Sequence, residues 1–275
     1  MEIIFLGTGG GRWVTITQRL RTGGFRIHAG RKIHIDPGPG ALVSMKEARI
    51  SPVDTDALIV THCHPDHYND AEILLEAMTQ GMTKVRGVLA ASETVLFGRD
   101  EVGPAISKYH RSKLAAVETL TPGKGFQVDE VRVEAIPTRH SDPTAVGLRF
   151  STGEGVITYT SDTEYYGGLS DHYKGSRAII FNVIRPAGER IPWHLCVDDV
   201  VKLVREAGPE LAVLNHFGMK MVERRKTEAL RVERETGVKT IAAMDGMVLT
   251  FAGGGVACES IRGGGKTFKQ AQLDF

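Results

Sequence analysis

Three histidines and one aspartate fall within the six positions 62–67 of this 275-residue chain. His62, His64, Asp66 and His67 come directly after an apolar run. Imidazoles and carboxylates are ligands that zinc, manganese and iron accept in proteins. A turn after a strand can aim neighbouring side chains at two adjacent ions, and clusters of these residue types mark metal or catalytic sites. We therefore predict a metal centre here rather than a polar surface loop with chance histidines.

Three later residues, His140, Asp162 and His216, are further candidate ligands, and each stands just beyond an apolar run that we expect to be a strand. A lone histidine in such a place is more often a satisfied turn residue. Together with the His-x-His-x-Asp-His pattern, however, the three resemble the ligand motifs of the metallo-β-lactamase superfamily in their order and contexts. The resemblance implies the fold of that superfamily, an α/β four-layer αββα sandwich in which two mixed sheets lie between helices.

The resemblance also implies two divalent transition-metal ions, zinc in the first place and manganese or iron as alternatives. One ion is held by three histidines and the other by an aspartate and two histidines, while a further aspartate bridges both. In that order the residues are His62, His64 and His140; Asp66, His67 and His216; and Asp162. A water that bridges two such ions becomes hydroxide near neutral pH, so no nucleophilic side chain is needed.

Over residues 1 to about 251 the resemblance is closest to the ribonuclease Z branch of the superfamily. The segments that carry it are Phe5–Gly9, Asn215–Lys220 and Ala243–Met247. The glycines of the first segment make a weak nucleotide-binding fingerprint, because Arg12 stands where a third glycine is needed. We interpret them as a tight turn after a buried strand.

Three departures from that branch argue against tRNA as a partner. The long arm with which ribonuclease Z grips tRNA is absent, because His140 and Asp162 are separated by only enough chain for one hairpin. The pair Phe181-Asn182 stands where the branch has His-Glu. Gly218 and Lys220 replace a serine and an arginine that the family places near phosphate. These changes leave hydrolysis intact, so we predict a small-molecule substrate.

Two residues are predicted to be catalytic. Asp66 is one, in addition to its role as a ligand, and the other is His194, which matches the proton-donating histidine of the branch. A histidine placed there can protonate a leaving alkoxide, although it could instead only cap the helix that starts at Val197. Asn182 could hydrogen-bond His194 without raising its basicity as glutamate would. Asp36, before Pro-Gly, matches an aspartate that supports the ligands in the family, or else only forms a turn.

The elements that position these residues alternate along the chain. Apolar and alternating runs predict strands at 1–6, 25–28, 32–35, 56–61, 87–90, 131–136, 145–150, 155–159, 178–182, 211–214, 239–242 and 247–251. Helical spacing predicts helices at 41–48, 71–80, 197–206 and 223–236. This alternation fits a single mixed α/β domain over residues 1–275, in which glycine-rich 253–275 is the candidate for loose packing. The stretch 92–124, with Tyr109-His110-Arg111, is either a substrate-contacting segment or a solvated connector.

Composition sets the remaining limits. The chain is 41% hydrophobic and 24% charged, as in ordinary globular proteins, and its net charge of +1 gives no field that gathers nucleic acid or acidic membrane. Cys63, Cys196 and Cys258 have unrelated spacings, so they predict neither disulfides nor a cysteine zinc motif. Neither a signal peptide nor a membrane span is recognisable, which predicts a cytoplasmic protein. A homo-oligomer is left open.

The activity predicted first is hydrolysis of a small phosphodiester, such as a cyclic nucleotide or a nucleotide-derived ester. Hydrolysis of a carboxyl ester, thioester or lactone on the same centre is the alternative enzyme activity. A metal-dependent sensor without turnover is the non-enzymatic alternative. Turnover of any generic ester distinguishes the enzyme from the sensor.

Overall fold

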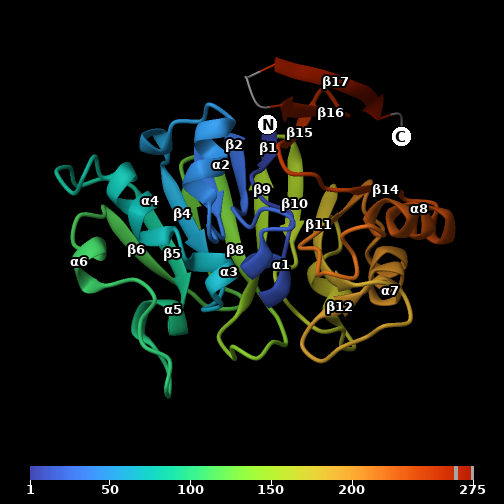
Figure 1. The fold of residues 1–275 in the computed structure, drawn as a ribbon, viewed down its shortest axis with the longest axis horizontal. Coiled ribbons are helices and arrows are strands. Elements are labelled where there is room, and N and C mark those ends of the chain that lie inside the picture. Colours follow the sequence, from blue (N-terminus) through green and yellow to red (C-terminus); the bar gives the residue numbers. More distant parts are fainter. Residues whose placement is uncertain (263–265, 274–275) are drawn as a thin grey trace.

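The computed structural model describes residues 1–262 and 266–273, which build two β-sheets (Figure 1). The first sheet has nine strands in the order β17-β16-β15-β1-β2-β3-β4-β5-β6. Their bounds are β1 Glu2–Phe5, β2 Phe25–Ala29, β3 Arg31–Ile35, β4 Ala57–Val60, β5 Val88–Ser92, β6 Ala116–Leu120, β15 Met247–Ala252, β16 Gly255–Arg262 and β17 Lys266–Leu273.

The second sheet follows the order β14-β13-β11-β10-β9-β8-β7, and the short β12 pairs with β11 outside this path. The bounds are β7 Gly125–Val128, β8 Val131–Pro137, β9 Val146–Thr152, β10 Gly155–Tyr159, β11 Ala178–Arg185, β12 Leu195–Cys196, β13 Leu211–Asn215 and β14 Lys239–Ala242. Strands β10, β11 and β13 are parallel, and β8 and β10 are both antiparallel to β9. The carboxyl ends of β8, β10, β11 and β13 therefore lie along one edge of this sheet.

Helices cover the outer faces of both sheets, with α2 and α4 on one side of the strands and α7 and α8 on the other (Figure 1). The bounds are α1 Arg12–Thr17, α2 Ala41–Glu47, α3 Pro65–Tyr68, α4 Ala71–Met78, α5 Glu93–Phe97, α6 Lys108–Arg111, α7 Val197–Ala207 and α8 Arg225–Thr236, with 3-10 turns η1 Pro52–Asp54 and η2 Leu169–His172. The αββα sandwich predicted from the sequence is confirmed.

Central strands such as β4 and β13 are buried on both faces, which explains their continuous apolar runs. In β4, Ala57 and Ile59 point into the core between the sheets, while Leu58 and Val60 pack under the helices of the first sheet. Successive side chains of a strand point to opposite faces, so each apolar pair serves one layer. The sequence run 211–214 of β13 divides in the same way between the inner core and the helices of the second sheet.

Several elements were not predicted from the sequence. Helices α1, α3, α5 and α6 have only four to six residues, too few for a helical period to show. Within the glycine-rich C-terminal segment, β16 and β17 form antiparallel strands beside β15. Residues 263–265 and 274–275, to which the prediction of loose packing also applied, lie outside the described residues. No helix in the described part of the chain is long and apolar enough to cross a membrane.

Candidate metal centre

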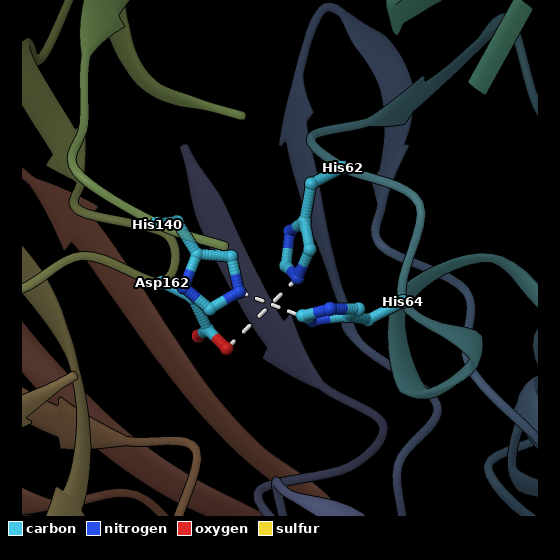
Figure 2. A group of neighbouring side chains, drawn as sticks. All are labelled: His62, His64, His140 and Asp162. Atoms are coloured by element: carbon cyan, nitrogen blue, oxygen red, sulfur yellow. Dashed lines mark hydrogen bonds and ion pairs between the residues drawn. The ribbon is translucent and has the colours of Figure 1, made fainter. Parts of the chain in front are cut away.

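Two groups of potential metal ligands gather where strands end. In each group, one ligand atom per residue lies within 4.8 Å of all the others: His62, His64, His140 and Asp162 in the first group, and Asp66, His67 and His216 in the second. Figure 2 shows the first group, with His62 and His64 on one side and His140 and Asp162 facing them. The structure thus brings together all seven predicted ligands, and it groups Asp162 with the three histidines of the first set.

The first group presents imidazoles whose free nitrogens converge. His62 is fully buried, and its Nε2 has no hydrogen-bond partner among the described residues. His140 donates from Nδ1 to the carbonyl of Trp193 over 3.0 Å, which leaves its Nε2 3.0 Å from Nδ1 of His64. Two nitrogens bound to a tetrahedral zinc lie roughly 3.4 Å apart. The donor set therefore fits a shared cation.

The second group adds a carboxylate to two imidazoles. Nε2 of His216 lies 3.0 Å from Nε2 of His67 and 3.4 Å from Oδ2 of Asp66. That same Asp66 oxygen accepts a hydrogen bond from the N–H of Gly11 over 2.8 Å. Nδ1 of His216 is buried without a hydrogen-bond partner in the part of the chain that the structure describes, and Oδ1 of Asp162 lies 3.5 Å from it. The facing Nε2 atoms of His67 and His216, together with the Asp66 oxygen, form a donor set that fits a cation.

Asp162 lies between the two groups. Its Oδ2 is 3.9 Å from Nε2 of His62, in the first group, and 3.7 Å from Nε2 of His67, in the second. Its Oδ1 accepts a hydrogen bond from Nδ2 of Asn182 over 2.7 Å. One buried carboxylate thus faces ligands of both groups, which is the position that a bridging ligand requires.

The contacts of Asn182 differ from the expectation. Its Nδ2 donates to Asp162 and also, over 3.0 Å, to the hydroxyl of Tyr159. An amide has two hydrogens to donate, and both are used here. Of the described residues, Asn182 thus donates to Asp162 and Tyr159 and does not bond His194, the possibility that the sequence offered.

Asp36 orients one ligand of the second group. Its carboxylate accepts hydrogen bonds from the N–H and the hydroxyl of Thr61, both over 2.8 Å, and from the Tyr159 hydroxyl over 2.9 Å. Nδ1 of His67 lies 2.9 Å from the same carboxylate. A partner of this kind fixes the tautomer of a ligating histidine, so that Nε2 of His67 faces the cluster. Asp36 therefore does more than form a turn.

Burial and charge set the protonation of the site. Burial lowers the pKa of His62 well below its ordinary value and that of His140 to about 4, so both are neutral donors at pH 7. Burial would raise the pKa of Asp162, but the neighbouring imidazoles outweigh it and hold the pKa well below its usual range. In His67, the carboxylates of Asp36 and Asp162 outweigh burial and hold the pKa well above its ordinary value. A bound cation would displace that proton.

Among the described residues, ten non-glycine residues have left-handed backbone, and four of them lie at the site. Asp36, Ser161, Trp193 and His216 have φ angles of 51°, 51°, 67° and 57°. Non-glycine residues in this region cost on the order of 1–3 kcal/mol each and persist only where the surrounding structure fixes them. Of these four residues, His216 is a candidate ligand. Ser161 and Trp193 stand directly before the site residues 162 and 194. The fold thus holds these side chains in directions that ordinary strand ends would not give.

His194 lies at the edge of the cluster. Its Nε2 is 3.4 Å from Oδ2 of Asp162, and its Nδ1 donates to the carbonyl of Pro192 over 3.1 Å. Burial would lower the pKa of His194, but the Asp162 carboxylate outweighs burial and raises it. Helix α7 is capped without this histidine, since the Asp199 carboxylate accepts from the N–H of Cys196 over 3.1 Å.

The segment 92–124 divides into two parts. His110 packs against α4, with its two ring nitrogens 2.9 Å from Glu72 and 3.0 Å from Glu76. An earlier part of the segment borders a cavity of about 500 Å³ beside the first ligand group. That cavity is lined by Cys63, His64, Thr94, residues 99–102 and 141–143. The connector interpretation thus describes the His110 region, and the loop 99–102 lies next to the site.

The two replaced family positions have local explanations. Lys220 pairs with Glu189, and so does Arg224 over 3.1 Å. A Cβ atom at Gly218 would lie only 2.4 Å from the carbonyl oxygen of Ile184, so glycine is required there. Position 218 therefore has no side chain to offer a phosphate, and the Lys220 ammonium is paired with Glu189 at the surface.

Comparison with known proteins gives the family. The family model described as "Beta-lactamase superfamily domain" matches residues 31–217. The crystal structure of YhfI from Bacillus subtilis, a metallo-beta-lactamase fold protein, aligns with a TM-score of 0.72 at 17% identity, over 90% of this chain and 97% of its own. An uncharacterized protein of Methanocaldococcus jannaschii, MJ1374, is 47% identical over 257 residues, which cover 92% of this chain and 96% of that protein. The chain belongs to the metallo-β-lactamase superfamily.

Within the metallo-β-lactamase superfamily the chain stands near ribonuclease Z. Ribonuclease Z of Mycobacterium sp. (strain KMS) is 27% identical over 249 residues, which cover 79% of this chain and 84% of that enzyme. Membership of this superfamily of metallo-hydrolases, together with the two histidine and aspartate groups, supports a metal-dependent hydrolase that binds divalent metal.

Proposed function

We propose that this superfamily member is a dinuclear metal hydrolase that cleaves small phosphodiesters. Zinc is the first candidate metal, and manganese or iron are the alternatives. The observation that carries the proposal is the adjacency of the two ligand groups, with Asp162 facing both of them. Two divalent ions held by these residues would lower the pKa of a bound water and would polarise the scissile group.

Asp66 and His194 are the side chains to which we assign proton-handling roles in the reaction. Burial would raise the pKa of Asp66, but His67 and His216 outweigh burial and lower it, so the carboxylate stays ionised and can accept a hydrogen bond from the attacking water. His194 holds its proton under the influence of Asp162 and points Nε2 into the cluster. From that position it can protonate the leaving oxygen.

The surroundings of the site favour a small substrate. Between His140 and Asp162 the chain forms only the hairpin of β9 and β10, so the arm that grips tRNA in ribonuclease Z has no counterpart. Cavities of about 500 Å³ and 420 Å³ lie beside His64 and beside His194, on the scale of small ligands. The similarity to a ribonuclease, an enzyme that cleaves phosphodiesters, favours that bond type.

A substrate panel tests the proposal directly. Metal-loaded enzyme is assayed on a bis-aryl phosphate, cyclic nucleotides, a lactone, a thioester and precursor tRNA. The small diesters should be turned over fastest, and precursor tRNA should be poor. Faster turnover of the lactone or thioester would assign the alternative ester chemistry, and no turnover of any substrate would leave the metal-dependent sensor. Cleavage of precursor tRNA as fast as the diesters would contradict the small-substrate assignment.

A further inference from the structure

Two carboxylates outside the ligand set anchor loops that carry or contact the candidate ligands. Asp142 is buried two positions after His140, and Asp245 is partly buried between β14 and β15. Within the described residues, neither makes a hydrogen bond or ion pair to a ligand side chain. Each instead accepts hydrogen bonds from backbone N–H groups of a loop next to the cluster.

Asp245 fixes the glycine-rich loop that follows β1. Its Oδ1 accepts from the N–H and the hydroxyl of Thr8 over 2.9 Å and 2.7 Å, and its Oδ2 accepts from the N–H of Arg21 over 3.0 Å. The two anchored residues bracket the segment 8–21, which contains α1. Hydrogen bonds to an ionised acceptor are roughly twice as strong as those between neutral groups, so Asp245 is a firm anchor for this segment.

The anchored loop contacts two ligands of the second group. The N–H of Gly11 donates to Asp66, and Phe217 bonds to the loop through its N–H and its carbonyl, over 2.8 Å and 3.2 Å. A Cβ atom at Gly10 would lie only 2.1 Å from Nδ1 of His216, so the loop backbone packs directly on that ring. A shift of the loop therefore moves Asp66 and His216 together.

Asp142 has the equivalent place beside the first group. Its Oδ2 accepts from the N–H of Cys63, the residue between the two histidines of the 62–64 turn, over 3.0 Å. Its Oδ1 accepts from the hydroxyl of Thr94 over 3.0 Å and from the N–H of Thr144 over 2.9 Å. Asp142 thus ties the turn to the loop that carries the third histidine of this group.

We infer that Asp245 and Asp142 are positioning residues that set the affinities of two metal subsites separately. Asp245 acts on the subsite of the second group and Asp142 on that of the first, each through the backbone of one loop. The inference rests on the proposed ligand set. Loss of an outer hydrogen-bonding partner typically costs 10–100-fold in metal affinity, and here each loss is confined to one subsite.

Cobalt(II) titration of the metal-free full-length protein tests the inference, because its absorption bands report each ion apart from activity. His216→Ala and His140→Ala proteins supply reference spectra with one subsite damaged. Asp245→Asn should weaken the second-group ion by about 10–100-fold and leave the first unchanged, and Asp142→Asn should do the reverse. Thr8→Val and Thr94→Val each remove a single hydrogen bond to these carboxylates. Each threonine variant should lower the cobalt affinity of the same subsite by a smaller factor than the matching asparagine variant. If an asparagine variant fails to melt cooperatively, the threonine variant is used in its place.

The pattern across variants decides the outcome. A general packing defect weakens both ions, so equal losses from either asparagine variant overturn the inference. Unchanged affinities in both asparagine variants overturn it as well. If the wild-type protein binds fewer than two cobalt ions, the proposed ligand set itself is contradicted. This result is seen before any variant is tested, so it is distinguishable from failure of the inference.

Discussion

Two regions of the molecule bury imidazoles, and only one of them suits a cation. At the strand ends, the facing nitrogens of His67 and His216 lie 3.0 Å apart, with carboxylates around them. On the face of β3 turned toward the helices, His34 is also fully buried, and its Nε2–H donates to the carbonyl of Gly23 over 2.9 Å. Its charged neighbour is the buried guanidinium of Arg26, and burial together with that charge lowers the pKa of His34 to about 3.

The difference lies in the charge of the neighbours. Burial lowers the pKa of an imidazole in either region, but carboxylates near the cluster favour positive charge there and Arg26 opposes it beside His34. A divalent ion would be stabilised at the first place and repelled at the second. The chain has ten histidines. Residue type alone does not tell a candidate metal ligand such as His67 from a buried histidine such as His34 that suits no cation.

Removal of the carboxylate shared by both groups should have the largest effect. Asp162→Ala should weaken both ions and lower turnover by about 10⁴-fold or more, because several kcal/mol of transition-state stabilisation are lost. Elemental analysis after reconstitution with zinc or manganese counts the ions per chain. His140→Ala should chiefly weaken one ion, and His34→Gln should keep both. Loss of metal from the His34→Gln protein would break the comparison between the two regions.

Removal of His194 should have the next largest effect. If this residue protonates the leaving group, His194→Ala should lower kcat by roughly 10²–10⁴-fold on a diester with a ribose alkoxide leaving group. An aryl phosphate needs little protonation and should lose much less, while the metal content stays unchanged. The ratio of the two losses is decisive, because a packing defect slows both substrates together. Equal losses would assign His194 a structural role.

A carboxylate at position 182 should weaken the cluster. Asn182→Glu removes the hydrogen bonds to Asp162 and Tyr159 and places two negative groups together, so metal affinity should fall by about 10–100-fold and turnover with it. Asn182→Gln, which keeps an amide, is the matched control and should lose less. Competition with a chelator of known affinity measures the change. A rise in activity for the glutamate variant would show that position 182 serves His194 after all.

The last prediction concerns stability in acid, away from the metal centre. The pKa of His34 is about 3 in the folded chain, below its ordinary unfolded value of roughly 6.5, so the unfolded chain binds more protons between those pH values. Stability should therefore fall as the pH drops through that window, with His34 contributing about 1.4 kcal/mol per pH unit. His34→Gln should flatten the slope in urea unfolding of the metal-free protein. An unchanged slope would show that His34 is already protonated when folded.

The sequence predicted which candidate ligands gather at one place, because they stand beside recognisable strands. His140, Asp162 and His216 each follow a run long enough to show its period, and the 62–67 turn shows its histidines directly. Short elements such as α1 and α3 have no such signal. The partner of Asn182 was missed because the contacts of a side chain within a strand depend on which groups the tertiary structure brings beside it.

The contact between Asp245 and the glycine-rich loop could not be predicted from the sequence for a different reason. Thr8 and Asp245 are 237 positions apart, so no local pattern connects them. One signal was present, since the run Gly9-Gly10-Gly11 marks a backbone that something approaches closely. In the structure that neighbour is His216.

The placement of the two ligand groups has a consequence for the chain as a polymer. His64 and His140 are 76 positions apart, and His67 and His216 are 149 positions apart. In each pair, one histidine comes after a strand of the nine-stranded sheet and the other comes after a strand of the second sheet. Ions held there would close two very long loops, as cross-links do, and would restrict the unfolded ensemble only while they stay bound. Chelation should then loosen the attachment of one sheet to the other before it disrupts either sheet, so that amide exchange rises first along the facing surfaces of the core.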